Sequence, residues 1–576
     1  MSAAPSMPSA QAPQSPAAHG AKLSSTPRWG MVIDLNRCVG CQTCTIACKH
    51  ANDTQPGVQW RRVIDVEFGT FPDVERVFMV VGCQHCAEPP CVPVCPTGAT
   101  RRRGDGLITM NYDQCIGCAS CVVACPYQAR TIAHGHSWYY GVETAQENHS
   151  RHREREGVAQ KCTFCIDKID EAMDRDLTPG TDWDVTPACA ASCIAQAIHF
   201  GNLNDPASNI SQLVRDEPYF RMHEELGTDP QVRYLYSTPA IPGRDLMPED
   251  LGDGRLDDPE NALVGKRQQF WDWRAAMNWC LGGLSSGAVA MLWLWSLYMP
   301  IVPASHAAFN FLFAILMVVG LLFVFFKIGR KSRFWRAILR PQTSWMSREL
   351  WAVFLFGSAT LISLVWPHGF FFAWAGVAAL FFLVCQAKIL QTARGIPNWR
   401  LPLVPWIVIA TGLLEGTSLL GLIAASQLPA LFMGGRDTAV TILPIAGVVI
   451  VLLNAGLWTG YRMSARAAGI GPLSRAVIAK ASLFLDLVGH GLPLLMFLLA
   501  FSLPDSAAAF LVIGGVAAIV GGIFKKFTLI VRAGYQQGYA LAMLPQRGSG
   551  TKAAPGLSET KTPPALTRVY AASGSS

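Results

Sequence analysis

All but two of the 18 cysteines in this chain stand in four groups of four, and this feature constrains the chain more than any other. The second group, CQHCAEPPCVPVCP, and the third, CIGCASCVVACP, each end in proline, whereas the fourth is split between KCTFC and PACAASC. The groups are Cys38, Cys41, Cys44 and Cys48; Cys83, Cys86, Cys91 and Cys95; Cys115, Cys118, Cys121 and Cys125; and Cys162, Cys165, Cys189 and Cys193. Sets of four thiols at such short spacing predict cofactor-binding centres.

The spacing is typical of cubane [4Fe-4S] clusters. Three thiolates on one tight C-x2-C-x2-C loop reach three corners of a cluster, and in the bacterial ferredoxin pattern the cysteine before the proline serves the neighbouring cluster. By this exchange the second and third groups share two clusters, and the first and fourth groups share two more around them. The predicted ligand sets are Cys38, Cys41, Cys44 with Cys193; Cys162, Cys165, Cys189 with Cys48; Cys83, Cys86, Cys91 with Cys125; and Cys115, Cys118, Cys121 with Cys95.

Other uses of these cysteines are weaker interpretations. Disulfide scaffolds are small, and this chain is not. Structural zinc also accepts CxxC pairs, but four groups with this spacing are far more often iron-sulfur. His85 between Cys83 and Cys86 invites a Rieske interpretation. Because thiolates already fill every ligand position, we expect His85 to lie beside a cluster, and we expect four [4Fe-4S] clusters rather than a mixture with [3Fe-4S].

Composition divides the 576 residues into two parts. With 51% hydrophobic and 15% charged residues the chain is apolar for a soluble protein, and the long apolar runs all follow Arg267. We expect a disordered N-terminus without a secretory signal, a four-cluster domain, a linker rich in Pro, Gly and Asp, a membrane anchor and a disordered tail. Their predicted bounds are 1–27, 28–237 (31–82 and 127–237 around an inserted unit, 83–126), 238–270, 271–532 and 533–576.

About eight apolar segments of spanning length, about 20 residues each, follow the linker. They lie near 277–300, 306–326, 350–367, 369–387, 403–426, 438–459, 481–502 and 506–529. Only Pro367 and His368 separate the third segment from the fourth, so one re-entrant pair is an alternative there. The predicted fold class is an α+β tandem of bacterial-type dicluster ferredoxin units followed by an all-α membrane bundle.

Basic residues gather in the loops at one end of these segments. They are Lys327, Arg330, Lys331, Arg333, Arg336, Arg340, Arg348, Lys388, Arg394, Arg400, Arg462, Arg466, Arg475, Lys480, Lys525, Lys526 and Arg532. The positive-inside rule predicts a multi-pass protein of the inner (cytoplasmic) membrane with this end, and the cluster domain with it, in the cytoplasm. We interpret the loops as membrane flanks rather than nucleic-acid contacts, and the twin Arg61 and Arg62, followed by VIDVEF, as structural.

Residues 31–235 resemble the four-cluster ferredoxin subunit of molybdopterin oxidoreductases of the dimethyl sulfoxide reductase type. The resemblance lies in CQTCTIACKHAND, GVQWRRV, VGCQHCAEPPCVPVCPTGAT and CIGCASCVVACPYQAR. Residues 270–530 more weakly resemble the polysulfide-reductase-like membrane anchor of the same complexes, through hydropathy and FWDWRAAMNW. The resemblance implies two fused subunits that relay electrons between a separate molybdopterin catalytic subunit and quinone in the lipid bilayer. It also implies that the cluster of Cys95, Cys115, Cys118 and Cys121 is nearest the membrane.

A quinone site needs proton donors where the clusters meet lipid. Ionisable residues inside membrane spans are costly and are therefore functional candidates. Asp486 and His490 lie one turn apart in the seventh predicted span, Glu415 lies in the middle of the fifth, and Arg274 and Asn278 open the first. Hydrogen bonding between helices is the alternative role for these five residues.

No motif in the sequence binds the substrate. The fused anchor and the run RMHEELGTDP look most similar to the cytoplasm-facing branch that oxidises sulfite with quinone, and oxidation of phenylacetyl-CoA is the alternative. If the catalytic partner carried an export signal, the cluster domain would lie outside the cytoplasm, and an S-oxide or N-oxide reductase would again be a candidate. From a different class, the chain would be a redox or ion-coupling module of a larger respiratory complex, which a continuous path of buried charge pairs would favour.

Overall fold

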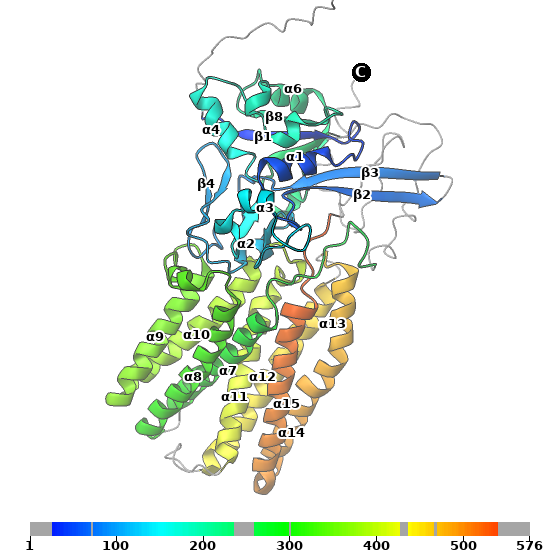
Figure 1. Ribbon diagram of the computed structural model, residues 1–576. Coiled ribbons are helices and arrows are strands. Elements are labelled where there is room, and N and C mark those ends of the chain that lie inside the picture. The colour runs from blue at the N-terminus through cyan, green and yellow to red at the C-terminus, as the bar shows by residue number, and fades with distance from the viewer. Residues whose placement is uncertain are drawn as a thin grey trace, which may run out of the picture.

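The computed structural model describes residues 26–70, 73–235, 258–298, 301–426, 436–465 and 469–539. A cysteine-rich domain lies over one end of a bundle of long helices (Figure 1). Most of the predicted disordered N-terminus and C-terminal tail falls outside the described residues, as do residues 238–257 of the predicted linker.

A four-stranded sheet in the order β8-β1-β10-β9 joins the beginning of the cysteine-rich domain to its end. β1 (Trp29–Asp34) pairs in parallel with β10 (Val232–Leu235) and antiparallel with β8 (Ile198–Asn202), and β9 (Tyr219–Phe220) pairs with β10. The consecutive apolar residues Met31, Val32 and Ile33 make β1 an inner strand, because all three are fully buried although they alternate between the two faces. In chain order β1 precedes the cysteine groups and β8 follows them, so this sheet joins the two ends of the domain around them.

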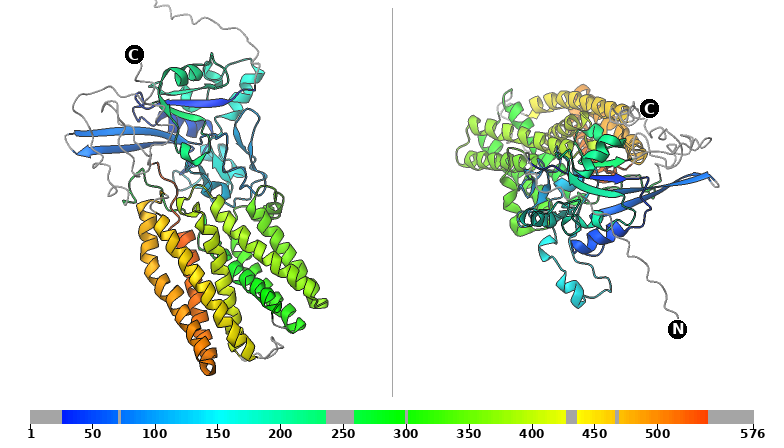
Figure 2. Two further views of the ribbon diagram at one scale, coloured as in Figure 1. Left: turned by 180° about the vertical axis from the view of Figure 1, so that it is seen from behind. Right: turned by 90° about the horizontal axis from the view of Figure 1, so that it is seen from above.

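Short elements carry the cysteines. The longer pair, β2 (Arg61–Thr70) and β3 (Asp73–Gly82), forms a ribbon that projects sideways from the domain (Figure 2). The other strand pairs are β4 (Thr100–Arg102) with β5 (Ile108–Met110) and β6 (Arg130–Ile132) with β7 (Ala159–Lys161). The helices are α1 (Thr43–Ala51), α2 (Ser120–Val123), α3 (Ala145–His149), α4 (Ile166–Asp174), α5 (Ala188–Ala191) and α6 (Asn209–Asp216).

Within the described residues, 8 helical spans are long and apolar enough to cross a membrane, as hydropathy predicts. They are α7 (Trp273–Ser296), α8 (Pro303–Lys327), α9 (Trp345–Val365), α10 (Gly369–Thr392), α11 (Leu403–Ala425), α12 (Arg436–Ser464), α13 (Pro472–Phe484) continued by α14 (Leu492–Ser502), and α15 (Ala507–Phe527). A π-helical stretch, Leu485–Gly491, joins α13 to α14. The re-entrant alternative for the third and fourth segments is wrong, because α9 and α10 are two full-length helices.

Small residues let the inner helices approach closely. α7 packs against α8, α10 and α11 and is the most buried span. A Cβ atom on Gly287 of α7 would lie 1.8 Å from the carbonyl oxygen of Gly412 in α11, and one on Gly416 would lie 2.1 Å from the backbone of Gly287. Close backbone approach through small residues is typical of helix pairs in membranes, where lipid gives no hydrophobic drive to association.

The cysteine-rich domain and the bundle share one hydrophobic core. Cys95 and Cys121 belong to the same buried cluster as Trp271, Trp399 and Trp458. The segment 533–539, which we expected to be part of a disordered tail, lies in this region: Tyr539 is 2% exposed and donates to the Tyr127 carbonyl at 3.2 Å. Packed residues thus continue past 532, the predicted end of the anchor, and the predicted tail begins after the described residues rather than at 533.

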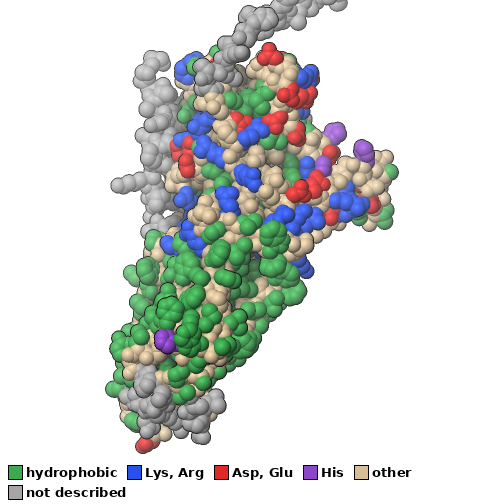
Figure 3. Space-filling model, turned by 90° about the vertical axis from the view of Figure 1, so that its left-hand side faces the viewer, with side chains coloured by type: hydrophobic (Ala, Val, Ile, Leu, Met, Phe, Trp, Pro, Cys, Tyr) green, Lys and Arg blue, Asp and Glu red, His purple; other side chains and the backbone are tan. Residues whose placement is uncertain are grey.

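The surface changes character at the junction. Charged side chains cover the cysteine-rich domain and gather at its border with the helices, below which the visible face of the bundle is largely hydrophobic (Figure 3). Exposed apolar residues on the helices include Phe354, Val365 and Leu452. Exposed apolar side chains of this extent are compatible with a multi-pass membrane protein.

Candidate iron-sulfur sites and the membrane junction

The loops that carry the first and third cysteine groups share one backbone conformation. In CVGCQTC the φ angles of Gly40 and Gln42 are 69° and 64°, and in CIGCASC those of Gly117 and Ala119 are 70° and 68°. Non-glycine residues adopt this left-handed conformation at a cost and do so mostly where function requires it. The helices α1 and α2 begin directly after these turns, so two distant loops present their thiols in the same way.

The predicted ligands Cys95, Cys115, Cys118 and Cys121 line a single cavity. Its empty volume is about 300 Å³. Burial raises the pKa of the Cys115 thiol to about 11, so that at neutral pH the metal-free thiol keeps its proton and iron binding would displace it. Four thiols that converge on one cavity fit a [4Fe-4S] cluster.

The other three predicted sets also bring their thiols together. Burial is the main cause that raises the pKa of the inner thiols, and neighbouring thiolates raise it further. These neighbours are Cys162, Cys189 and Cys165 around Cys48; Cys83, Cys91 and Cys125 around Cys86; and Cys189, Cys38 and Cys193 around Cys44. Among the described residues no three or more His, Cys, Asp or Glu side chains are grouped to hold a single metal ion.

One ligand set lies at the outer surface of the domain. Cys41 is exposed, and around this set Val39, Ile46 and Ile194 are 51%, 67% and 72% exposed. Exposed apolar side chains gathered in one place mark an interaction surface. The domain thus has one open end at Cys41 and one end buried against the helices at Cys118.

His85 does not face a ligand position. Its Nε2 lies 3.1 Å from the Cys162 carbonyl oxygen, its Nδ1 accepts from the backbone N–H of Ile108 at 3.1 Å, and its ring stacks on Phe164. Burial lowers the pKa of His85 well below its ordinary value. A neutral imidazole with both nitrogens engaged by backbone groups gives no support to the Rieske alternative.

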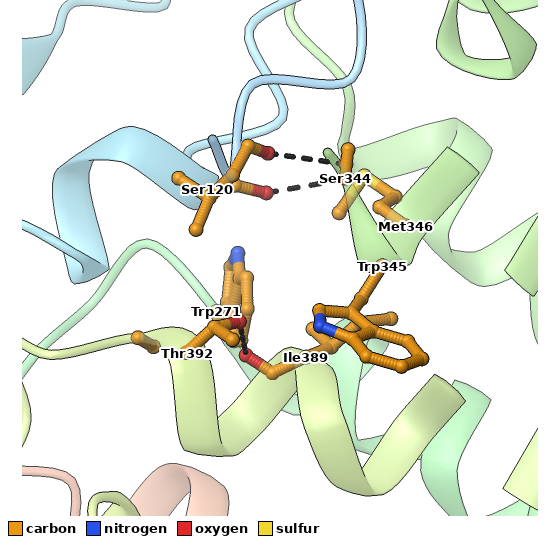
Figure 4. Close-up of a pocket in the computed structure, with 9 residues that line it drawn as sticks. Ser120, Trp271, Ser344, Trp345, Met346, Ile389 and Thr392 are labelled. Atoms are coloured by element: carbon orange, nitrogen blue, oxygen red, sulfur yellow. Dashed lines mark hydrogen bonds between the residues drawn. The ribbon is translucent and has the colours of Figure 1, made fainter. Parts of the chain in front are cut away.

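A narrow crevice lies at the junction between the cysteine-rich domain and the helices (Figure 4). Ser120 lies at its upper edge, Trp271 and Trp345 at its two sides, and Ile389 and Thr392 below. Its empty volume of about 250 Å³ includes space open to solvent, so it is a shallow opening rather than an enclosed cavity. Above it, Ser120 accepts from the Cys118 thiol at 3.4 Å, while the Trp271 indole donates to the Cys118 carbonyl at 3.2 Å. An aromatic, partly open crevice therefore touches the loop of the innermost ligand set.

A buried acid lies one helical turn below this crevice. Glu349 of α9 is 4% exposed and accepts from Asn278 of α7 at 3.0 Å, and Gln386 of α10 donates to the Asn278 carbonyl at 2.9 Å. Arg274, in contrast, pairs with Asp272 at 2.8 Å at the edge of the bundle. Of the two predicted residues in the first span, Asn278 thus belongs to the polar group beneath the crevice, and Arg274 does not.

The structure brings the other three predicted residues together through two lysines. Lys526 pairs with Glu415 at 2.5 Å, and neither side chain is exposed by more than 2%. Lys525 lies 2.9 Å from Nε2 of His490 and also contacts Asn454. Asp486 pairs with Arg462 at 2.8 Å and lies 3.9 Å from Nδ1 of His490.

Sequence reasoning missed several members of these groups. Glu349 was hidden in a predicted basic flank, and Lys525 and Lys526 were interpreted as loop residues, although both are 2% exposed inside the bundle. One signal was available in the sequence. Two lysines directly follow an apolar run that contains no acid, so an acid that pairs with them has to lie on another helix. Hydropathy alone does not reveal which helix that is.

Comparisons with known proteins agree with this arrangement. Residues 74–140 match the family described as "4Fe-4S dicluster domain". The chain is 39% identical to a subunit of the selenate reductase of Mesobacillus selenatarsenatis over 36% of this chain and 72% of that protein. It is also 39% identical to a subunit of the sulfite dehydrogenase of Allochromatium vinosum (36% and 81%), and 35% identical to the iron-sulfur cluster-binding subunit of the menaquinone reductase of Nitratidesulfovibrio vulgaris (36% and 88%).

The chain belongs to the family of iron-sulfur subunits of multi-subunit oxidoreductases. As an iron-sulfur subunit it is an electron-transfer component, and its kinship with subunits of larger reductases implies a catalytic partner. The matches take in 36% of this chain. In this iron-sulfur subunit the electron-transfer domain is continuous with a bundle of helices that are long and apolar enough to cross a membrane.

Proposed function

We propose that the chain relays electrons through four [4Fe-4S] clusters between a separate molybdopterin catalytic subunit and quinone in the inner membrane. The observation that carries the proposal is the cavity lined by Cys95, Cys115, Cys118 and Cys121, which adjoins the crevice at the membrane junction. When bound, the clusters supply one-electron redox chemistry. The thiols of the four sets would hold them, and the apolar core around the inner sets excludes water.

The two ends of the domain have distinct roles in this proposal. The open end, with Cys41, Val39, Ile46 and Ile194, is the docking surface for the catalytic partner. The closed end presents Cys118 to the crevice between Trp271 and Trp345, where a quinone ring would stack. Exposed apolar groups suit a protein partner, and a crevice between aromatic rings suits a flat ligand.

Proton transfer to or from quinone falls to Glu349 in this proposal. It is a buried acid one helical turn after Trp345, which lines the crevice, and Asn278 fixes its position through a 3.0 Å hydrogen bond. Of the predicted quinone residues, Asn278 keeps a positioning role, whereas Asp486, His490 and Glu415 lie in the other polar group and Arg274 lies at the edge of the bundle. A buried carboxyl group in the membrane is a functional candidate.

For the substrate we propose sulfite, oxidised in the cytoplasm, with phenylacetyl-CoA oxidation and S-oxide or N-oxide reduction as alternatives. One relative is a subunit of sulfite dehydrogenase, and an equally identical one is a subunit of selenate reductase. Identity therefore does not separate oxidation from reduction, and the proposal for sulfite rests on the predicted cytoplasmic orientation.

The test is electron paramagnetic resonance of the complex purified with its partners. After reduction with dithionite we expect four interacting [4Fe-4S] signals. In an oxidised sample, sulfite should reduce the same clusters, and added quinone should then reoxidise them. Zinc or fewer clusters would contradict the ligand sets. Signals that respond to quinol but to neither sulfite nor phenylacetyl-CoA would leave the relay in place and favour a reductase.

A second candidate function, ion coupling, is favoured by the polar groups inside the bundle. A Cβ atom on Gly283 would lie 2.4 Å from the Lys526 ammonium and 3.6 Å from the Gln386 side-chain oxygen, so the group of Glu349 continues into that of Glu415. Together they cross the bundle from α9 to the π-helical stretch. Proton movement across proteoliposomes during quinone turnover, lost in Glu415→Gln with electron transfer intact, would support coupling.

A further inference from the structure

Three buried cations of the cysteine-rich domain have no role in holding a cluster. Arg61 and Lys161 are fully buried, and Arg130 is 5% exposed. All three come from strands: Arg61 opens β2, Arg130 opens β6, and Lys161 ends β7. Burying a charge is expensive unless an opposite charge is close, so each of these cations needs an anion nearby.

Carboxylates do not meet this need. Arg61 donates to the Met31 sulfur at 3.1 Å and approaches the Cys189 sulfur at 3.8 Å, while its Nε and one terminal nitrogen have no protein partner. Lys161 donates to the Cys162 carbonyl at 2.7 Å. Within the described part of the chain, no Asp or Glu pairs with either side chain.

Arg130 shows the same pattern. It donates to the Cys91 sulfur at 3.1 Å, to the Thr100 hydroxyl at 3.1 Å and to the Met110 sulfur at 3.2 Å. Again the described residues include no carboxylate partner. The anions that remain for the three cations are the cysteine thiolates and the clusters that they would hold.

Each cation lies between two ligand sets. The thiolates that act most strongly on Arg61 are Cys189, Cys162 and Cys48 of one set and Cys44 of the outermost set. Those around Lys161 are Cys83 and Cys91 of one set and Cys162 of another, and those around Arg130 are Cys91, Cys83 and Cys125 of one set and Cys121 of the innermost. Direct contacts place Arg61 beside the set of Cys189 and Arg130 beside the set of Cys91, and the electrostatic influence of each arginine reaches a second set.

Backbone design reserves the space for at least one of them. Arg61 pairs with Gly82 across the β2–β3 ribbon. A Cβ atom on Gly82 would lie 3.2 Å from a terminal nitrogen of Arg61 and 3.0 Å from the Trp60 carbonyl oxygen. A side chain at this position would crowd the guanidinium group of Arg61. The β2–β3 ribbon therefore holds this charge beside the thiols.

We propose that Arg61 and Arg130 are fixed charges that raise the reduction potentials of the clusters on either side of them. The inference rests on the proposed four-cluster function. Reduction adds one electron, and hence one negative charge, to a cluster with its four thiolates, and a nearby cation stabilises that charge. Net charge around the sulfurs is among the factors that set cluster potentials. The two arginines provide the strongest case because a guanidinium group stays protonated in proteins.

The test is a redox titration of the full complex in membranes, followed by electron paramagnetic resonance, for the wild type, Arg130→Gln and Arg130→Lys. In Arg130→Gln we expect the reduction equilibrium of the two flanking clusters to fall at least tenfold, which is about 59 mV for a one-electron couple. The two outer clusters should keep their potentials. Arg130→Lys, which keeps the charge, should stay near the wild type, and Arg102→Gln, on the exposed end of β4, serves as the matched control.

A second variant guards against loss of a cluster. Should iron content fall in Arg130→Gln, Arg61→Gln is titrated instead, with the shift expected in the two outer clusters. Unchanged potentials in a variant with full iron content would overturn the inference, as would an equal shift in Arg130→Lys. Fewer than four clusters in the wild type would instead contradict the proposed function, so the two failures are distinguishable.

Discussion

At the scale of single residues, the buried polar side chains carry the greatest consequences. Lys526 and Glu415 form an ion pair inside the bundle, and Gly522 leaves the space that the Glu415 carboxylate occupies, since a Cβ there would lie 2.2 Å from it. Removing one partner of a buried pair leaves the other charge without compensation, whereas removing both does not.

We therefore expect Lys526→Met to lower the free energy of unfolding by about 3–5 kcal/mol, and the double variant Lys526→Met with Glu415→Gln to recover most of this loss. Thermal unfolding in detergent measures both. Lys480→Met, on the exposed side of α13, is the matched control and should change little. Equal stability of the single and double variants would show that the pair is not coupled.

Glu349 provides a functional prediction at the same scale. Glu349→Gln keeps the hydrogen bond to Asn278 but cannot exchange a proton, so we expect quinol-dependent reduction of the clusters to slow by tenfold or more. Reduction by dithionite should be unchanged. Asp505→Asn, an exposed acid beyond the far end of α14, is the control, and a normal quinol rate in Glu349→Gln would move the proton donor elsewhere.

At the scale of elements, three glycines fix how the domain meets the helices. A Cβ on Gly329, after α8, would lie 1.9 Å from the carbonyl oxygen of Gly157, and one on Gly117 would lie 2.1 Å from the same atom. Arg330 reinforces this contact, since its backbone N–H donates to Ile116 and its side chain donates to the Glu156 carbonyl at 2.8 Å. The loop of the innermost ligand set is thus pressed onto the end of α8.

A side chain at this contact should separate the two parts. In Gly329→Val we expect faster proteolysis at the junction and quinol-dependent reduction lowered by at least tenfold, with cluster content unchanged. Gly357→Val is a matched control, because a Cβ on Gly357 of α9 meets nothing within 4 Å. Intact quinol reduction in Gly329→Val would mean that electrons reach the clusters by a route that does not need this contact.

The same elements show how far sequence reasoning reaches. Cysteine spacing and hydropathy were sufficient to predict the class of cofactor and the eight spans, because both depend on local pattern. The roles of Arg330, Arg333 and Arg336 were not predictable in this way. We interpreted them as membrane flanks, but they donate to backbone carbonyls of residues 112–116 and 153–156 in the cysteine-rich domain. Contacts between distant segments leave no local pattern.

At the scale of the whole molecule, this finding bears on orientation. Part of the basic excess at one end is explained by contacts with the cysteine-rich domain, independently of the membrane potential. The cytoplasmic orientation therefore needs a direct test. The exposed residues Asp505, just beyond α14, and Lys480, in the second half of α13, lie toward opposite ends of the span and allow one.

We expect Asp505→Cys to react with a membrane-impermeant maleimide in intact cells, and Lys480→Cys to react only after permeabilisation. Labelling of both variants is compared with that of the wild-type chain under each condition, because Cys41 is exposed whereas Cys280 and Cys385 are buried. The opposite labelling pattern would place the cluster domain outside the cytoplasm and would favour a reductase over sulfite oxidation.

The nested sheet of the cysteine-rich domain has a consequence for biosynthesis. The ribosome releases β1 well before β8 and β10, and β1 needs both of these strands as pairing partners. The second and third cysteine groups lie between them and emerge as a contiguous unit, and domains generally fold as units during synthesis. We therefore expect the two inner sites to mature first, while the outer two stay open until Cys193 has been made. The helices emerge last, so the electron path would be built from its middle outward.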